Sequence, residues 1–372
     1  MKFNSTVALL LGLSLVLPTF SLPLANATEN LWRTMEPMLT ARSGFGVAVV
    51  DDKIYAIGGI YGIQSSYDNN EQYDPATNTW ATKTAMPTPR GDFAIAVFQD
   101  KIYTIGGSIR AGQWTTELTD VNEVYDPATD TWTTKTSMPT PKAGLSASAV
   151  DGKIYLIGGF TQSANGTRQT SKETLVYDPI ADSWTTKTPI PTATLDYATA
   201  VVDDKIYVIS GTSRAYSDSL INLTQIYDPK TDTWSQGAPI PYAIQQAAAG
   251  ATTGFAAPKT IYVMGGFTSF YWPTNLTQVY HPENDTWSSG ADIPTPLYAL
   301  GVAIVNDHLY AIGGSPGYLQ PATNQNNQYT PIGYIPEFPS WSSILIMLVA
   351  VISVAVIYRC ILNKPNEGRR DQ

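Results

Sequence analysis

Apolar residues along this chain fall into short, regularly repeated runs rather than into stripes of helical period. Segment 44–50 is almost wholly apolar and ends at the polar pair Asp51 and Asp52, and segment 53–59 then runs to two glycines. A third segment follows at 70–75, and a fourth at 79–86 alternates large and small side chains. A continuous apolar run predicts a strand buried on both faces, and alternation predicts a half-exposed strand. The stretch therefore predicts four antiparallel strands, with a tight turn at the Asp pair.

This four-segment unit occurs six times. Its glycine pairs begin, in chain order, at Gly58, Gly106, Gly158, Ser210 (where serine replaces the first glycine), Gly265 and Gly313. In the first five units a Tyr and a Trp seven residues apart follow, beginning with Tyr73 and Trp80. A period of about fifty residues predicts the blades of a β-propeller. The glycines would allow close packing at the strand ends, and the flat aromatic side chains would fill the space between blades.

A glycine pair after an apolar strand, followed by Tyr and Trp at a fixed separation, resembles the kelch repeat. The resemblance covers about residues 32–331, which is nearly all of the chain between its two apolar ends. It implies an all-β, six-bladed propeller with four-stranded blades, and we place this domain at residues 28–333.

The two ends of the repeat array are out of step with each other. The last unit has Tyr329 but no Trp after it, whereas Trp32 stands near the start with no preceding Tyr. We predict that the segment around Trp32 supplies the fourth strand of the last blade. Such pairing would close the ring and leave no open sheet edge.

The flanking segments predict export and a membrane anchor. Residues 1–27 carry Lys2, an apolar core and a small-residue cleavage pattern, which predicts a secretory signal peptide, with an uncleaved anchor helix as the alternative. The charge-free run from Trp341 predicts a transmembrane helix over 341–361, with a buried core helix as the alternative. The basic tail 362–372 would be cytoplasmic, so we expect a single-pass protein of the cell membrane with its large domain extracellular.

A proline-rich stalk, residues 334–340, would join the propeller to this helix. Its sequence "PEF" from Pro336 resembles the Pro-Glu-Phe tails of archaeal surface proteins. In that family the tail can be a sorting signal that is cut, a lipid then replacing the helix. A plain stiff stalk is the alternative.

Composition excludes several classes of partner and site. The formal net charge of −9 argues against nucleic-acid binding, which needs a basic surface. Cys360 is the single cysteine, so no disulfide can form within the chain. The two histidines, His281 and His308, stand at different positions of the repeat, so we predict no metal site and no cofactor. In particular, the copper site of the similar propeller galactose oxidase needs a Tyr–Cys link, for which the predicted propeller has no cysteine.

One face of the propeller is the expected binding surface. In a strand hairpin, the start of strand one and the end of strand two lie at the same end, together with the long loops that follow the glycine pairs. Sixteen residues before the glycine pair stand Arg42, Arg90 and Lys142 in blades one to three. The equivalent residues of the other blades are uncharged: Thr194, Ile244 (aligned across an insertion) and Leu297.

This register predicts a crescent of three cations. Arginines in this position often bind ligands in kelch domains, and the resemblance implies that role for Arg42 and Arg90. Asp92 and Asp196, two residues further along, would face the channel. The crescent would bind a carboxylate- or sulfate-bearing partner, and the alternative is internal pairing with Asp92 and its neighbours.

The long loops add cations and flat aromatic side chains that could stack on sugars or anchor a protein partner. The residues chosen as ligand-binding are Arg110, Trp114, Arg214, Tyr271 and Trp272. Glycosylation sequons occur at Asn165, Asn222, Asn275 and Asn284.

The sequence thus predicts a cell-surface recognition or adhesion module that binds a protein or carbohydrate ligand and is not an enzyme. The alternative is a carbohydrate-active enzyme on the same scaffold, such as a glycosidase, lyase or sugar epimerase. That enzyme would use Asp92 or Asp196 as its acid or base, with Arg42 and Arg90 beside them.

Overall fold

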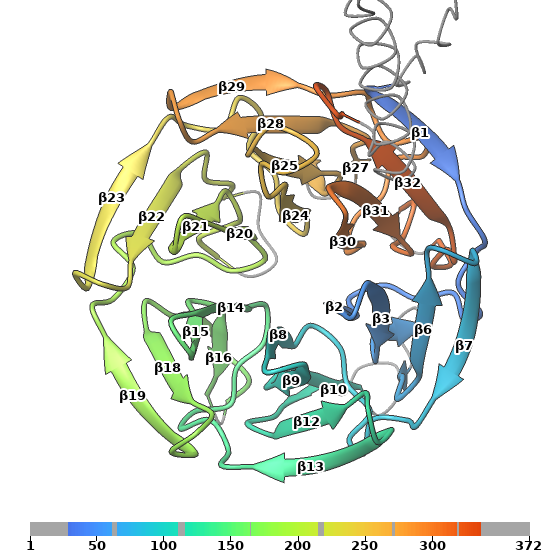
Figure 1. Ribbon diagram of the computed structural model, residues 1–372. Helices are drawn as coiled ribbons and strands as arrows, with labels where there is room; N and C mark the ends of the chain where they lie inside the picture. Colours follow the sequence, from blue (N-terminus) through green and yellow to red (C-terminus); the bar gives the residue numbers. More distant parts are fainter. Residues whose placement is uncertain are drawn as a thin grey trace, which may run out of the picture.

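Six antiparallel sheets stand radially around a central channel (Figure 1). This computed structural model describes residues 29–335, apart from 62–64, 111–115, 164, 215–218, 270–271 and 318–319. The predicted signal peptide, membrane helix and basic tail lie outside the described residues. Among the residues that are described, no helix has the length and apolarity to cross a bilayer.

Each blade has four strands, and the innermost lines the channel. Blade one consists of β2 (Gly46–Val50), β3 (Lys53–Ile57), β6 (Asn70–Asp74) and β7 (Thr79–Lys83). Blade two is β8 (Ala94–Phe98), β9 (Lys101–Ile105), β12 (Asn122–Asp126) and β13 (Thr131–Lys135), and blade three is β14 (Ser146–Val150), β15 (Lys153–Ile157), β18 (Thr174–Asp178) and β19 (Ser183–Lys187). Blade four is β20 (Ala198–Val202), β21 (Lys205–Ile209), β22 (Thr224–Asp228) and β23 (Thr233–Gly237), and blade five is β24 (Ala248–Ala251), β25 (Ile261–Met264), β28 (Thr277–His281) and β29 (Thr286–Ser289). Blade six is β30 (Gly301–Val305), β31 (His308–Ile312), β32 (Asn326–Thr330) and β1 (Leu31–Thr34).

The predicted strands and turns are confirmed, with one shift at the glycine pair. Asp51 and Asp52 have φ of 49° and 57°, as a two-residue hairpin of type I′ requires. Strand β3 ends at Ile57, before the glycines rather than after them. Gly58 has φ of 62°, and a Cβ there would lie 2.7 Å from the carbonyl oxygen of Arg90. The pair therefore turns the chain out of the sheet against the next blade.

The Tyr–Trp spacing is explained by the junction between blades. Tyr125 donates to Asp130 Oδ1 at 2.6 Å, and the same oxygen accepts from the backbone N–H of Thr84 in the previous blade at 2.9 Å. Trp132 packs on Tyr125 and donates to the carbonyl oxygen of Thr84 at 2.9 Å. Tyr125 also belongs to the apolar core between blades one and two, with Ile57 and other buried residues. One Tyr–Asp–Trp group thus joins neighbouring sheets from the core to the rim.

The predicted closure by the N-terminal segment is confirmed. Strand β1 pairs with β32 so that Trp32 lies opposite Tyr329, and the two strands lie side by side in Figure 1. Trp32 donates to the carbonyl oxygen of Ala291 at 2.9 Å. Asn30, which the sequence had not singled out, takes the role of the junction Asp. Its Oδ1 accepts from Tyr329 Oη at 2.7 Å and from the N–H of Ala291 at 2.6 Å.

Candidate functional site

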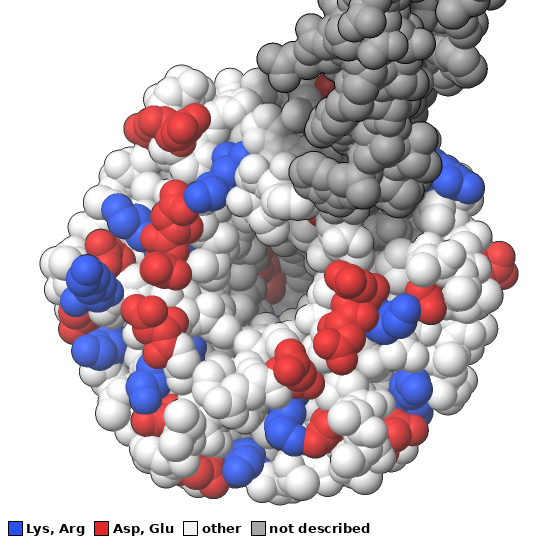
Figure 2. All heavy atoms as spheres, viewed as in Figure 1, with Lys and Arg blue, Asp and Glu red and all other residues white. Residues whose placement is uncertain are grey.

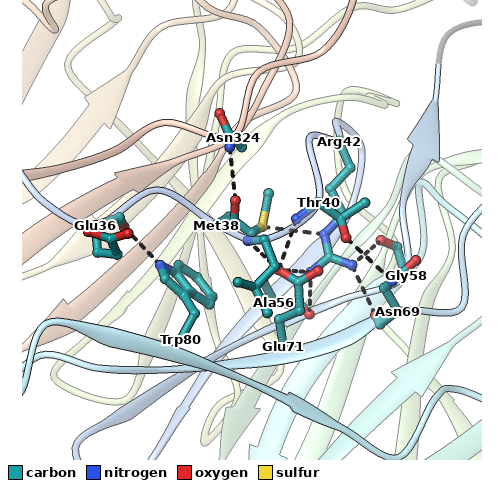
Figure 3. Close-up of polar contacts among 11 residues, drawn as sticks. Glu36, Met38, Thr40, Arg42, Ala56, Gly58, Asn69, Glu71, Trp80 and Asn324 are labelled. Carbon is teal, nitrogen blue, oxygen red and sulfur yellow. Dashed lines mark hydrogen bonds and ion pairs between the residues drawn. The ribbon is translucent and has the colours of Figure 1, made fainter.

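The guanidinium of Arg42 is sealed inside blade one (Figure 3). The residue is 0 % exposed. Its Nη2 lies 3.3 Å from Glu71 Oε2 and donates to the carbonyl oxygen of Ala56 at 3.0 Å, and its Nη1 donates to that of Asn69 at 3.1 Å. Burial lowers the pKa of Arg42 to about 10 while Glu71 opposes this shift, so the group stays charged at neutral pH.

The other two cations of the predicted crescent are enclosed in the same way. Arg90 is 0 % exposed, pairs with Glu123, and donates to the carbonyl oxygens of Gly106 and Thr104 at 2.9 Å each. Lys142 is 1 % exposed and lies 2.5 Å from Glu173. Burial lowers the pKa of both cations, and the paired glutamates oppose this shift.

The acidic partners of the two arginines hold the segment that enters each blade. Glu71 accepts from the N–H of Leu39 at 3.1 Å, and Glu123 accepts from Thr88 Oγ1 at 2.7 Å. Blades four and five have no cation at this position and carry Gln225 and Gln278 in place of the glutamate. Gln225 holds the entering segment without a charge. Its Oε1 accepts from the N–H of Thr192 at 2.8 Å, and its Nε2 donates to the carbonyl oxygen of Thr192 at 3.1 Å.

The prediction of a ligand-binding cationic crescent is therefore wrong. Arg42, Arg90 and Lys142 have internal partners and almost no exposed surface. Each cation of blades one to three has a glutamate partner, although Glu173 stands two positions before the register of Glu71 and Glu123, and blades four and five have neither a cation nor a glutamate at these positions. That pattern is typical of a structural pair. The alternative of internal pairing is the correct one, although the partners are Glu71, Glu123 and Glu173 rather than Asp92.

A closed ring of backbone hydrogen bonds encircles the channel two residues further along. It joins six equivalent residues, one from each blade: Gly44, Asp92, Gly144, Asp196, Gln246 and Ala299. Each N–H donates to the carbonyl oxygen of the preceding member, and the six distances lie between 2.7 and 3.0 Å. All six residues have φ between 51° and 63°, which is left-handed backbone. We call this group the channel ring.

Asp92, Asp196 and Gln246 are the polar members of the channel ring. Asp92 Oδ2 accepts from Ser108 Oγ at 3.2 Å and lies 3.7 Å from Arg110 Nη2. Asp196 Oδ2 accepts from Gln246 Nε2 at 3.2 Å. The carboxylates occupy the space left by glycines, because a Cβ on Gly44 would lie 2.6 Å from Asp92 Oδ1. Asp92 and Asp196 also both line the small cavity beside the ring.

The carboxyl group of Asp196 has a raised pKa. Burial, and second the nearby charge of Asp92, raise the pKa of Asp196 to about 7 from its ordinary value of 3.8. The hydrogen bond from Gln246 and the charge of Arg168 oppose this shift. Asp196 is consequently part protonated near neutral pH. The channel ring can therefore both donate and accept a proton there.

We expect Asp196→Asn to stabilise the propeller at alkaline pH. The pKa of Asp196 is higher in the folded chain than in the unfolded one, so the parent loses stability as pH rises from about 4 to about 7. The Asn variant cannot ionise and avoids this loss. We expect a gain of up to about 4 kcal/mol at pH 8, because each of the three pH units between about 4 and 7 contributes about 1.4 kcal/mol, and little gain at pH 4. Thermal scans of both proteins across this range measure the effect, and equal pH profiles would contradict the assignment.

The channel ring opens into a small cavity. Its volume is about 140 Å³, and apolar side chains including Phe45, Phe93 and Tyr197 line it beside the polar members of the ring. Figure 2 shows the central channel as a hollow in one face, with acidic side chains near its edge. Sites that enclose a whole small ligand measure about 300 Å³ or more. This cavity therefore fits a few waters or one group at the tip of a larger ligand.

The loops beyond the glycine pairs form short hairpins in four of the blades. The hairpins are β4 (Ile60–Tyr61) with β5 (Ser65–Ser66), β10 (Ser108–Arg110) with β11 (Thr116–Leu118), β16 (Phe160–Gln162) with β17 (Arg168–Thr170), and β26 (Phe267–Ser269) with β27 (Trp272–Pro273). The N–H of Arg110 donates to Ser66 Oγ at 2.9 Å, which joins the hairpins of blades one and two. The loop face is thus partly rigid, and the channel ring lies beneath it.

The predicted loop residues differ in their exposure to solvent. Trp272 is 74 % exposed, and Arg214 is also exposed on the loop of blade four. Arg110 turns inward toward Asp92 and is half-buried. Trp114 and Tyr271 lie outside the described residues. The loop face therefore presents at least one free aromatic surface and one exposed cation.

The predicted glycosylation sites are accessible, and their use stays a prediction. Asn165, Asn222 and Asn284 are exposed, and Asn275 is half-buried. No group of three or more His, Cys, Asp or Glu residues suited to a metal ion occurs among the described residues. His281 bonds Ser288 Oγ at 2.7 Å, whereas His308 packs against Tyr334 in blade six.

Gln246 and the backbone ring were not identified from the sequence. The glycine or aspartate in four of the six blades was a usable signal, since these residues tolerate left-handed backbone. Gln246 and Ala299 lack that signature and could be placed only by the repeat register.

Two family models match the chain. The Attractin/LZTR1 beta-propeller model matches residues 119–341, and the KLHDC2/KLHL20/DRC7 Kelch-repeats domain matches residues 18–159. Kelch-like protein terF of Aspergillus terreus is 28 % identical over 78 % of this chain and 53 % of its own length. Alpha-scruin of Limulus polyphemus is 26 % identical over 49 % of this chain and 20 % of its own length. The chain thus spans between a fifth and about half of these relatives.

A solved structure agrees with the same architecture. The structure of YjhT superposes with a TM-score of 0.67 and covers 78 % of this chain and 95 % of its own. The two sequences are 17 % identical. At that level the similarity shows the fold alone.

Proposed function

Because the chain belongs to the kelch-repeat β-propeller family, we propose that it is a recognition module that binds a protein or glycan partner on the loop face. The partner would cover the hairpins beyond the glycine pairs and reach toward the channel ring with a polar or charged group. The anchor and signal predictions place this module at the cell surface, held by the helix at 341–361 with the propeller outside.

The observation that carries this proposal is the contrast between the buried inner cations and the exposed side chains of the loop face. The cations of the inner register are buried, whereas Trp272 and Arg214 are exposed on the loop face. Exposed Trp and Arg are the residue types that most often dominate binding energy at interfaces. The carboxylates of Asp92 and Asp196 lie in the cavity beneath. Exposed loop residues around a small cavity that contains carboxylates suit a ligand larger than the cavity itself.

A glycan array and a screen against extracellular proteins would test the proposal. We expect the double variant Arg214→Ala/Trp272→Ala to lose at least tenfold in affinity for the partner found, since each truncated hot-spot residue costs about 1–2 kcal/mol or more. The matched control is Ile180→Ala/Lys230→Ala, which removes an exposed apolar residue and a cation from the opposite face. A loop-face variant that binds like the parent, or a control that binds as weakly as the loop-face variant, would contradict the assignment.

A second candidate is carbohydrate-active catalysis at the channel ring. It is favoured by the position of two carboxyl side chains, Asp92 and Asp196, in the lining of one cavity, where burial raises the pKa of Asp196 toward the range of a general acid. Turnover of a bound glycan that is lost in Asp196→Asn would support this candidate. Binding without turnover supports recognition alone.

A further inference from the structure

Blade five differs from the other blades in the turn between its two inner strands. Residues 252–260 form a long connection there, whereas the equivalent turns of the other blades have two residues, such as Asp51 and Asp52. These turns lie at the end of the sheets opposite the glycine pairs, and we call this side the turn face.

The insertion is held in one conformation by Asp307 of blade six. The carboxylate accepts three backbone hydrogen bonds, from Thr253 at 2.6 Å, Ala256 at 2.7 Å and Ala257 at 3.0 Å. Burial alone would raise the pKa of Asp307, but these donors outweigh it and hold the pKa below its ordinary range. The insertion is therefore a built feature and not a loose loop.

The same insertion grips the chain where it leaves the propeller. The N–H of Ile335 donates to the carbonyl oxygen of Ala256 at 2.7 Å, and Gly333 packs against Pro258. Between them, Tyr334 packs on His308 with ring centroids 4.3 Å apart. The exit of the chain is thus fixed on the turn face at blades five and six.

Apolar side chains are exposed around this exit. Phe255 is 81 % exposed, Ile335 69 % and Ile332 42 %. We call these three residues the exit patch. Exposed apolar residues clustered on two adjoining segments indicate an interaction surface more strongly than scattered ones.

Charge on the turn face is distributed unevenly. The inner turns of blades one to four carry exposed aspartates: Asp51, Asp52, Asp100, Asp151, Asp203 and Asp204. In blade five the insertion has no acidic residue, and in blade six Asp307 is buried and satisfied by amides. The inner turns nearest the exit are therefore the ones that a negatively charged surface would repel least.

The occupant of the exit patch follows from the length of the stalk. Five residues separate Ile335 from Trp341, where the charge-free run begins. The six steps from Ile335 to Trp341 reach at most about 22 Å when the chain is extended. An anchor that starts at Trp341 would hold the exit patch within that distance of the bilayer, and Phe and Ile side chains partition into the interface.

We propose that the exit patch contacts the lipid bilayer and that the propeller is tilted so that blades five and six face the membrane. The loop face then points away from the cell, with the acidic turns of blades one to four raised off the lipid. This inference rests on the anchor in the proposed function and adds the orientation in which the module is displayed.

Lipid-dependent quenching in the full-length protein tests the proposal. In a Cys360→Ser background, single cysteines replace Phe255, Ile180 or Trp272 and are labelled with bimane. Ile180 is 76 % exposed on the turn face at blade three, and Trp272 lies on the loop face. The proteins are reconstituted into phosphatidylcholine vesicles that contain a headgroup-spin-labelled lipid. We expect several-fold stronger quenching at position 255 than at the other two positions.

Flotation of the vesicles separates the possible failures. If the protein floats and position 255 is quenched no more than position 272, the exit patch does not contact lipid. If positions 255 and 180 are quenched equally, the whole turn face lies flat and the tilt is wrong. If the protein does not float, the anchor fails and this inference fails with it, whereas binding at the loop face is unaffected.

Discussion

Deletion of residues 28–40 is expected to abolish cooperative thermal unfolding of the propeller. The deletion removes strand β1, so that β32 becomes an open edge and Tyr329 loses both Trp32 and the acceptor Asn30. It also removes the contacts of Met35 and Met38 in the core between blades six and one. Calorimetry of the truncated and parent proteins measures the result.

Two point variants separate closure from chain length. Trp32→Ala should cost about 3–5 kcal/mol, because it removes a large packed side chain and its bond to Ala291. Leu31→Ala lies on the same strand with an exposed side chain and should change stability by less than about 0.5 kcal/mol. A truncated protein that melts as sharply as the parent would contradict closure by strand β1.

Arg90→Ala is expected to destabilise the propeller by about 3–5 kcal/mol, because Glu123 would remain buried without its countercharge. The carbonyl oxygens of Gly106 and Thr104 would lose a donor as well. Denaturant unfolding of the two proteins measures the difference.

The chain itself supplies a matched control for this prediction. Blade five carries Ile244 and Gln278 where blade two carries Arg90 and Glu123. The double variant Arg90→Ile/Glu123→Gln should therefore recover more than half of the lost stability, since uncharged side chains replace the whole pair. If Arg90→Ala unfolded at the same denaturant concentration as the parent, the cation would not be structural.

The blades could be predicted from the sequence because each blade repeats the same local sequence pattern. Two-residue polar turns, glycine pairs and the Tyr–Trp spacing mark strand ends within a few residues, and the orphan Trp32 shows how the ring closes. Local patterns of this kind can be recognised without knowledge of the tertiary structure. For the same reason the boundary at Ile57 was misplaced by two residues, since only the neighbouring blade reveals why the chain turns there.

The candidate site was harder to predict because residues that stand close together in the repeat differ in whether their side chains are buried in a blade or line the channel. Arg42 and Asp92 stand two positions apart in the repeat, yet one is sealed in a blade and the other lines the channel. The needed signal was the comparison of strand three across blades, where Glu71 and Glu123 accompany arginines and Gln225 and Gln278 do not. The backbone hydrogen bonds of the channel ring give no comparable signal in the sequence, because almost every residue has a carbonyl and an N–H group.

Partner binding by the Arg90→Ile/Glu123→Gln protein is the most direct test of whether the inner cations build the scaffold while the loop face recognises the ligand. Affinity for the partner should equal that of the parent within about twofold, a difference of less than 0.5 kcal/mol. A loss of tenfold or more in this folded variant, with Arg214→Ala/Trp272→Ala binding normally, would place recognition at the buried cations and contradict the account.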